Sequence, residues 1–198
     1  VSAIYDGFSF EEMIDDIARN NGKCAEVACW PQGKAERRYA GVSHINVDNL
    51  EPEYLTYINN YCKDKGVEIS SLAFYPNTMD GDPEKRQSNI EHLKKVINMS
   101  SALGVNMVTT FVGRDQNKTV EENIEIFKEV WPPIIKFAEE KGVRIAIENC
   151  PMLFGAEQWP GGQNLFTTPK LWRAMFEIID SDYFGINYDP SHFIWQQI

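Results

Sequence analysis

The sequence predicts an α/β protein of the (β/α)8 TIM-barrel type, incomplete here, with about six β/α units present and the C-terminal units missing. Three observations support this fold class. A helix that ends in Gly-Val recurs at a fixed spacing. The apolar runs between helices are continuous, which is typical of parallel strands covered on both faces. No GxGxxG pattern follows the first apolar run, although a doubly wound nucleotide-binding sheet would carry one there, so a barrel is favoured.

The Gly-Val repeat gives the order of the elements. It occurs at Gly66, Gly104 and Gly142, with successive glycines 38 residues apart. Each glycine fits the position just after a helix, where a positive φ is inexpensive for a residue without Cβ. The apolar residues that follow fit a buried strand. The repeating unit is therefore helix, tight turn and strand.

The helix starts share a capping residue followed by Glu at the third position or Pro at the first. They are Ser9 with Glu12, Thr119 with Glu122, Asp82-Pro83 and Thr168-Pro169. Pro132-Pro133 fall within the predicted helix 120–141 and are expected to break or kink it, because proline lacks the N–H that the helix uses.

The apolar runs between the helices predict six strands. These are residues 1–5, 24–30, 67–74, 105–112, 143–149 and 184–188. A complete barrel has eight units in about 250 residues. We therefore expect one domain over residues 1–198, truncated at its C-terminus.

Composition narrows the possible partners and the compartment. The net charge of −10 and pI near 4.8 disfavour binding to nucleic acid or to an anionic membrane. No apolar run approaches the roughly 20 residues of a membrane span. The four cysteines, Cys24, Cys29, Cys62 and Cys150, have no CxxC spacing, so they are expected to be reduced core residues of a cytoplasmic protein.

Acidic side chains and a histidine end the last two predicted strands. Glu148 and Asn149 close the run 143–149, and Asp189 and His192 follow the run 184–188. Active sites of barrels form at this end of the strands. Two buried carboxylates on neighbouring strands would repel each other without a positive partner, and a divalent cation is the simplest one. Asp189 before proline also fits an ordinary turn, so the combination of residues carries the prediction.

The sequence resembles the sugar phosphate isomerases and epimerases of the xylose-isomerase-like barrel superfamily. The resemblance rests on residues 145–149 (Ile-Ala-Ile-Glu-Asn), 159–164 (Trp-Pro-Gly-Gly-Gln-Asn) and 187–192 (Asn-Tyr-Asp-Pro-Ser-His). It implies that Glu148 and Asp189 bind one divalent metal ion (Mn, Mg, Co or Zn). It also implies a strand-seven His and a strand-eight Glu as further ligands, which would lie beyond residue 198.

The resemblance further implies proton abstraction next to a carbonyl, with the cation stabilising an enediolate. Glu148 and His192 are then the expected catalytic residues, and His192 is also expected to contact a small sugar or sugar phosphate. Four more residues, at strand ends or in the segments that follow them, are candidates for substrate binding, although each also fits a core or solvated position. They are Trp30, His44, Arg114 and Asn149.

Other functions remain open from sequence. A related barrel could dehydrate a polyol-derived ketone, hydrolyse DNA as an apurinic endonuclease does with three zinc ions, or bind sugar without turnover. The nuclease is disfavoured by the net charge and by the presence of only three histidines. An open sheet edge after six strands would favour a homo-oligomer.

Overall fold

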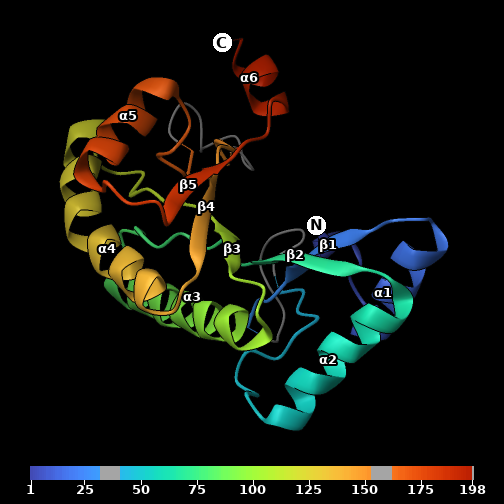
Figure 1. Cartoon of the computed structure of the whole chain (residues 1–198). Helices are drawn as coiled ribbons and strands as arrows, with labels where there is room; N and C mark the ends of the chain where they lie inside the picture. The colour runs from blue at the N-terminus through green and yellow to red at the C-terminus, as the bar shows by residue number, and fades with distance from the viewer. Residues whose placement is uncertain (32–40, 153–161, 198) are drawn as a thin grey trace. The chain divides into compact units, whose positions relative to one another are not determined.

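The computed structural model describes residues 1–31, 41–152 and 162–197, and in this part of the chain helices alternate with five strands (Figure 1). The elements are η1 (Ser2–Ile4), α1 (Phe10–Arg19), β1 (Cys24–Ala28), α2 (Pro52–Lys65), β2 (Glu68–Ala73), α3 (Pro83–Leu103), β3 (Met107–Thr110), α4 (Val120–Glu140), β4 (Arg144–Glu148), α5 (Pro169–Ile178), β5 (Phe184–Asn187) and α6 (Ser191–Gln196). The strands follow the order β1-β2-β3-β4-β5. This alternation agrees with the predicted α/β class.

The chain forms two compact units. The first contains Val1–Phe74 and Lys95–Val108, and the second contains Tyr75–Lys94 and Thr109–Ile198. The prediction of a single domain stays a prediction.

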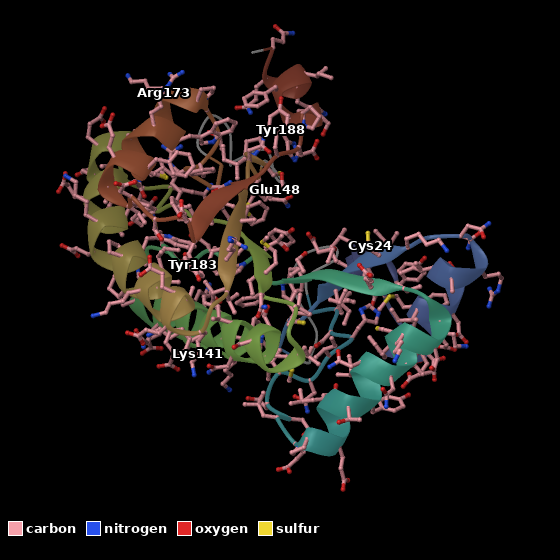
Figure 2. All side chains as sticks on the ribbon, viewed as in Figure 1. Cys24, Lys141, Glu148, Arg173, Tyr183 and Tyr188 are labelled. Atoms are coloured by element: carbon pink, nitrogen blue, oxygen red, sulfur yellow. The ribbon has the colours of Figure 1, made fainter. Side chains whose placement is uncertain are left out.

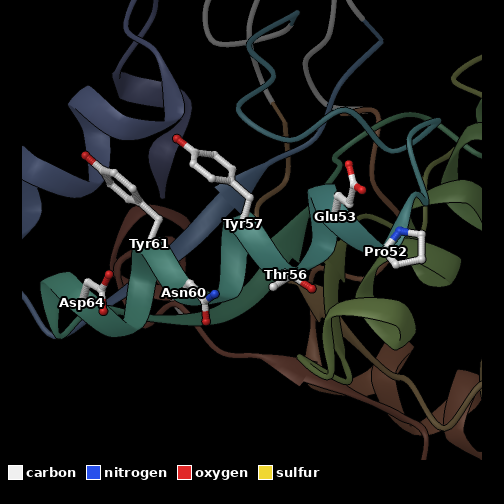
Figure 3. Close-up of a pocket in the computed structure, with 7 residues that line it drawn as sticks. All are labelled: Pro52, Glu53, Thr56, Tyr57, Asn60, Tyr61 and Asp64. Carbon is white, nitrogen blue, oxygen red and sulfur yellow. The ribbon is translucent and has the colours of Figure 1, made fainter.

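In the first unit, β1 and β2 pair in parallel, with Val27 opposite Leu72. Helices α1 and α2 are joined by Tyr61, which donates a hydrogen bond to Asp15 at 2.9 Å, and by an ion pair between Lys65 and Asp15. Figure 3 shows a hollow over α2, lined by Tyr57 and Tyr61 among others. The Tyr57 hydroxyl donates to Glu11 of α1, so the two tyrosines hold the two helices together at the margin of this hollow.

In the second unit, β4 and β5 pair in parallel, with Glu148 opposite Asn187. An aromatic core stands beside them. Its rings belong to Phe127, Trp131, Phe166, Trp172, Phe176 and Phe184, and neighbouring centroids lie 5.5–6.2 Å apart. Burial of these large rings contributes much of the stability of the unit.

The local signals of the sequence are confirmed. Gly66, Gly104 and Gly142 have φ angles of 65°, 72° and 68°, and a strand follows each turn. Both capping boxes form, because Ser9 and Thr119 each accept a hydrogen bond from the backbone N–H of the Glu three residues later. These glycines and caps fix where each helix ends or begins.

Two predictions about secondary structure were wrong. Residues 1–5 form the 3-10 turn η1 instead of a strand, because the Tyr5 N–H bonds back to the Ser2 carbonyl. The Ser2 hydroxyl accepts a hydrogen bond from the backbone N–H of Ala28 in β1. The predicted break at Pro132-Pro133 does not occur, because α4 continues through both prolines, with buried Trp131 before them and buried Ile134 and Ile135 after them.

The expectation of buried cysteines holds only in part. All four cysteines are free thiols, but Cys24 is exposed at the first position of β1. Cys29 and Cys62 are buried. Burial raises the pKa of the Cys62 and Cys150 thiols to about 11, so both thiols are protonated at neutral pH.

Candidate metal centre

The carboxyl ends of β4 and β5 bring the predicted acids to one edge of the sheet. Glu148 is the last residue of β4, and Asp189 follows the end of β5 by two residues. Figure 2 shows Glu148 and Tyr188 at the same end of the two strands, with Lys141 and Tyr183 toward the opposite end. Because the strands are parallel and in register, side chains that end them meet on the same side.

Glu148, Asp189 and His192 form one cluster. The His192 Nε2 atom lies 3.6 Å from Glu148 Oε1 and 3.4 Å from Asp189 Oδ2. One ligand atom from each of the three residues lies within 4.8 Å of the others. The Glu148 side chain is 15% exposed, His192 23% and Asp189 42%, so the cluster is sheltered but open to solvent on the Asp189 side. The two acids and the histidine therefore converge as the sequence predicted.

The first residue of α6, Ser191, stabilises the charged form of Asp189. The Asp189 Oδ1 atom accepts a hydrogen bond from the Ser191 N–H at 2.8 Å. Hydrogen bonding by the Ser191 side chain, together with this backbone bond and the charge of His192, holds the pKa of the Asp189 carboxyl below its ordinary value. Asp189 is therefore ionised at neutral pH, which is the form that binds a cation.

Asn149 links the two strand ends. Its side chain is fully buried, its Oδ1 accepts from the Asp189 N–H at 2.7 Å, and its Nδ2 donates to the Asp189 carbonyl at 3.0 Å. Both polar groups of the amide thus contact the backbone of Asp189. The predicted substrate contact of Asn149 stays a prediction, while its observed bonds are those of a residue that positions Asp189.

Asn164 supports Glu148 from the other side, and the sequence did not indicate it as a site residue. Its Nδ2 donates to the carbonyls of Glu148 at 2.9 Å and Cys150 at 2.8 Å, and its side chain is buried. Asn164 lies in the predicted loop 159–164, of which residues 159–161 lie outside the described part of the chain. The only feature of the sequence that could have indicated this role is the position of Asn164 at the end of a Gly-rich loop.

The remaining predicted substrate residues are divided between the two units. Arg114 belongs to the second unit and is half-buried in the loop after β3. The Asn77 side chain accepts from the Arg114 N–H at 2.9 Å and donates to its carbonyl at 2.8 Å. Gly113 precedes it with φ +88°, where a Cβ would lie 2.3 Å from Asn77 Oδ1. This loop is therefore held firmly, and the substrate role of Arg114 stays a prediction.

Trp30 and His44 belong to the first unit. Trp30 packs against the cluster of Ala3, Ala28 and Val42, with its ring 5.8 Å from that of Phe74. His44 is buried, with its Nδ1 atom 3.0 Å from the Ser2 hydroxyl. The substrate roles of Trp30 and His44 stay predictions.

The burial of His44 predicts a pH dependence of stability. Burial lowers the pKa of His44 below its ordinary value of 6.5, against the opposing effect of a hydrogen bond with the Tyr5 backbone. Since the unfolded chain binds the proton more readily, this contribution to stability is complete above pH 6.5 and is lost as the pH falls below it. We expect His44→Gln to flatten the fall in the free energy of unfolding between pH 7 and pH 5. Urea unfolding at several pH values measures this, and parallel curves for both proteins would contradict it.

Comparison with known proteins identifies the family of the chain. The model of the xylose isomerase-like TIM barrel family matches residues 14–197. The chain belongs to this family. The barrel type predicted from the Gly-Val repeat and the continuous strands is therefore confirmed. None of the curated protein sequences compared matches the chain.

Solved structures with the same fold include both epimerases and a dehydratase. The probable 3-DHS dehydratase AsbF from Bacillus anthracis has a TM-score of 0.70 at 17% identity, covering 98% of this chain and 63% of its own. D-psicose 3-epimerase with D-tagatose, from Clostridium cellulolyticum H10, has a TM-score of 0.66 at 15% identity, covering 93% and 59%. A xylose isomerase-like TIM barrel protein from Mycobacterium smegmatis, in complex with magnesium, has a TM-score of 0.63 at 13% identity, covering 93% and 57%.

These similarities establish the fold and show how much of a related structure the chain covers. The chain spans 57–63% of the length of the three structures, so it corresponds to a truncated barrel, as the sequence predicted. Within the described residues, no helix combines the length and the apolar character needed to cross a membrane.

Proposed function

We propose that the protein is a divalent-metal-dependent isomerase or epimerase of a sugar or sugar phosphate. The observation that carries this proposal is the convergence of Glu148, Asp189 and His192 at the carboxyl ends of β4 and β5, with ligand atoms within 4.8 Å of one another. Family membership supports it, because the site lies where barrel enzymes perform their chemistry.

The donor set fits a small divalent cation. Carboxylate oxygens are ligands for Mn²⁺, Mg²⁺, Co²⁺ and Zn²⁺, and the two acids of the cluster supply them beside His192. Two acids held next to each other in a partly buried site are destabilised by repulsion unless a positive charge neutralises them. Glu148 and Asp189 would hold the ion, and the ion would supply Lewis acidity toward the carbonyl and hydroxyl oxygens of the substrate.

The side chains of the site divide the remaining work. Glu148 would remove the proton from the carbon next to the carbonyl, since a carboxylate beside a substrate carbon is a suitable general base. Isomerisation then needs the proton on the neighbouring carbon, and epimerisation needs a second acid to deliver a proton from the opposite face of the substrate. His192 would donate a hydrogen bond to a substrate oxygen. Asn149 and Asn164 keep the Glu148 and Asp189 backbones in place, so that the proton transfer takes place at a fixed geometry.

A ketone dehydratase is the second candidate, and the likeness to the probable dehydratase from Bacillus anthracis favours keeping it. Both reactions begin with removal of a proton next to a carbonyl. They differ in the next step, because an epimerase returns the proton to carbon, whereas a dehydratase expels a hydroxyl group. The products therefore distinguish them.

Solvent isotope exchange tests the proposal. We expect the Mn²⁺-loaded protein, incubated in D₂O with ketohexoses and their phosphates, to incorporate deuterium at the carbon next to the carbonyl of at least one of them. NMR of the recovered sugars measures the exchange, and Glu129→Gln, which changes an exposed acid of α4, serves as the control. An unsaturated product would favour the dehydratase. Metal-loaded protein that neither exchanges protons nor eliminates water from any sugar would contradict the proposal.

A further inference from the structure

Each acid of the metal centre presents one carboxylate oxygen to His192 and has its other oxygen bound to the protein. Asp189 directs Oδ2 toward His192, while its Oδ1 accepts from the Ser191 N–H. Glu148 directs Oε1 toward His192, while its Oε2 accepts from the side-chain amide of Asn187 at 2.8 Å. In both acids, the oxygen turned away from His192 accepts a hydrogen bond from the protein.

Asn187 is placed for this contact by the sheet. It is the last residue of β5 and pairs directly with Glu148 in the parallel register. A carboxylate can only accept hydrogen bonds, so the Asn187 amide must turn its Nδ2 toward Glu148. Oε1 also accepts a bond from the Asn149 N–H at 3.1 Å, which fixes the plane of the Glu148 carboxylate from the other side.

This arrangement has a consequence for the choice of metal ion. Ca²⁺ takes six to eight oxygen ligands and commonly uses both oxygens of a carboxylate, whereas Mg²⁺ takes six in a compact octahedron. The Asn187 bond occupies one lone pair of Oε2 and keeps Oε1 turned toward the cluster, so binding through both oxygens would require the Glu148 carboxylate to turn against this bond. Protein groups that hold a ligand in this way commonly change metal affinity by about 10–100-fold when they are removed.

We propose that Asn187 is a positioning residue that restricts Glu148 to binding through one oxygen, and that it thereby selects Mn²⁺ or Mg²⁺ over Ca²⁺. This inference rests on the metal centre of the proposed function, but it concerns Asn187, whose side chain does not itself bind the ion. The selection arises from the hydrogen bond to Oε2.

Competition between two ions tests the role of Asn187. Binding of Mn²⁺ is measured by electron paramagnetic resonance, and Ca²⁺ is titrated against it, for the parent protein, Asn187→Leu and Asn60→Leu. Leucine has nearly the shape of asparagine, but its side chain cannot donate a hydrogen bond. Asn60 is exposed on α2 and controls for the loss of an amide. We expect the preference for Mn²⁺ over Ca²⁺ to fall by about tenfold or more in Asn187→Leu alone.

The outcomes separate this inference from the proposed function. If the parent binds Mn²⁺ and the preference is the same in Asn187→Leu, the role of Asn187 is overturned while the metal centre stands. If the parent binds neither ion, both are overturned. Should Asn187→Leu fail to fold, a crystal structure of the parent with Mn²⁺ decides: one Glu148 oxygen on the ion, with the Asn187 bond kept, supports the inference, and two oxygens on the ion overturn it.

Discussion

Replacing Glu148 by Gln, or Asp189 by Asn, is expected to weaken Mn²⁺ binding by on the order of 100-fold, because each change removes one of the two charged ligands of the cluster. The loss of a ligand should weaken binding more than the loss of a residue that only supports a ligand. Both substitutions keep the size of the side chain. Isothermal titration calorimetry with Mn²⁺ measures the change directly, and the same variants are expected to lose the solvent exchange of sugar protons.

Thermal unfolding provides an independent measurement of the same effect. A ligand that binds only the folded protein raises the unfolding temperature, so Mn²⁺ should stabilise the parent and Glu129→Gln but not the two site variants. Equal Mn²⁺ affinity in all four proteins would exclude the cluster as a metal site.

Local signals explain how much of the fold could be predicted. A glycine at a helix end and a capping box act within a few residues, so Gly66, Ser9 and Thr119 determine nearby structure whatever the rest of the chain does. The acids at the ends of β4 and β5 were predictable for a related reason: parallel strands necessarily end at the same edge of a sheet. Knowing the strands was enough to bring Glu148 and Asp189 together.

The features that escaped prediction depend on contacts between distant residues. Asn187 and Asn164 reach Glu148 across 39 and 16 residues of sequence, and an asparagine gives no sign in sequence of which group it will bind. Residues 1–5 are apolar enough for a strand, but the bonds of the Ser2 hydroxyl to Ala28 and His44 accompany a turn instead. Sequence periodicity reports which face is buried and says little about such polar contacts.

The hydrogen bond of Trp131 in the core is another polar contact that the sequence did not reveal. Among the substitutions considered, we expect the largest loss of stability from replacing Trp131. Its indole is fully buried, its ring lies about 6 Å from those of Phe127 and Phe184, and its Nε1–H donates to the Val112 carbonyl at 3.0 Å. We expect Trp131→Ala to lower the free energy of unfolding by about 3–5 kcal/mol, since it leaves a large cavity in the core and removes one of the two hydrogen bonds to the Val112 carbonyl, the other coming from the Thr78 hydroxyl at 2.8 Å. Urea unfolding measured by circular dichroism tests this.

Two matched variants separate the causes. Trp131→Phe keeps an aromatic ring but removes the donor, so it should cost about 0.5–1.5 kcal/mol, which is the net contribution of one hydrogen bond, because the Thr78 hydroxyl still donates to the Val112 carbonyl. Trp195→Ala removes the same side chain from α6, where it is 77% exposed, and should change stability by less than about 0.5 kcal/mol. If Trp131→Ala and Trp195→Ala destabilise equally, the aromatic cluster around Trp131 does not hold the second unit together, and the continuity of α4 through Pro132-Pro133 needs another cause.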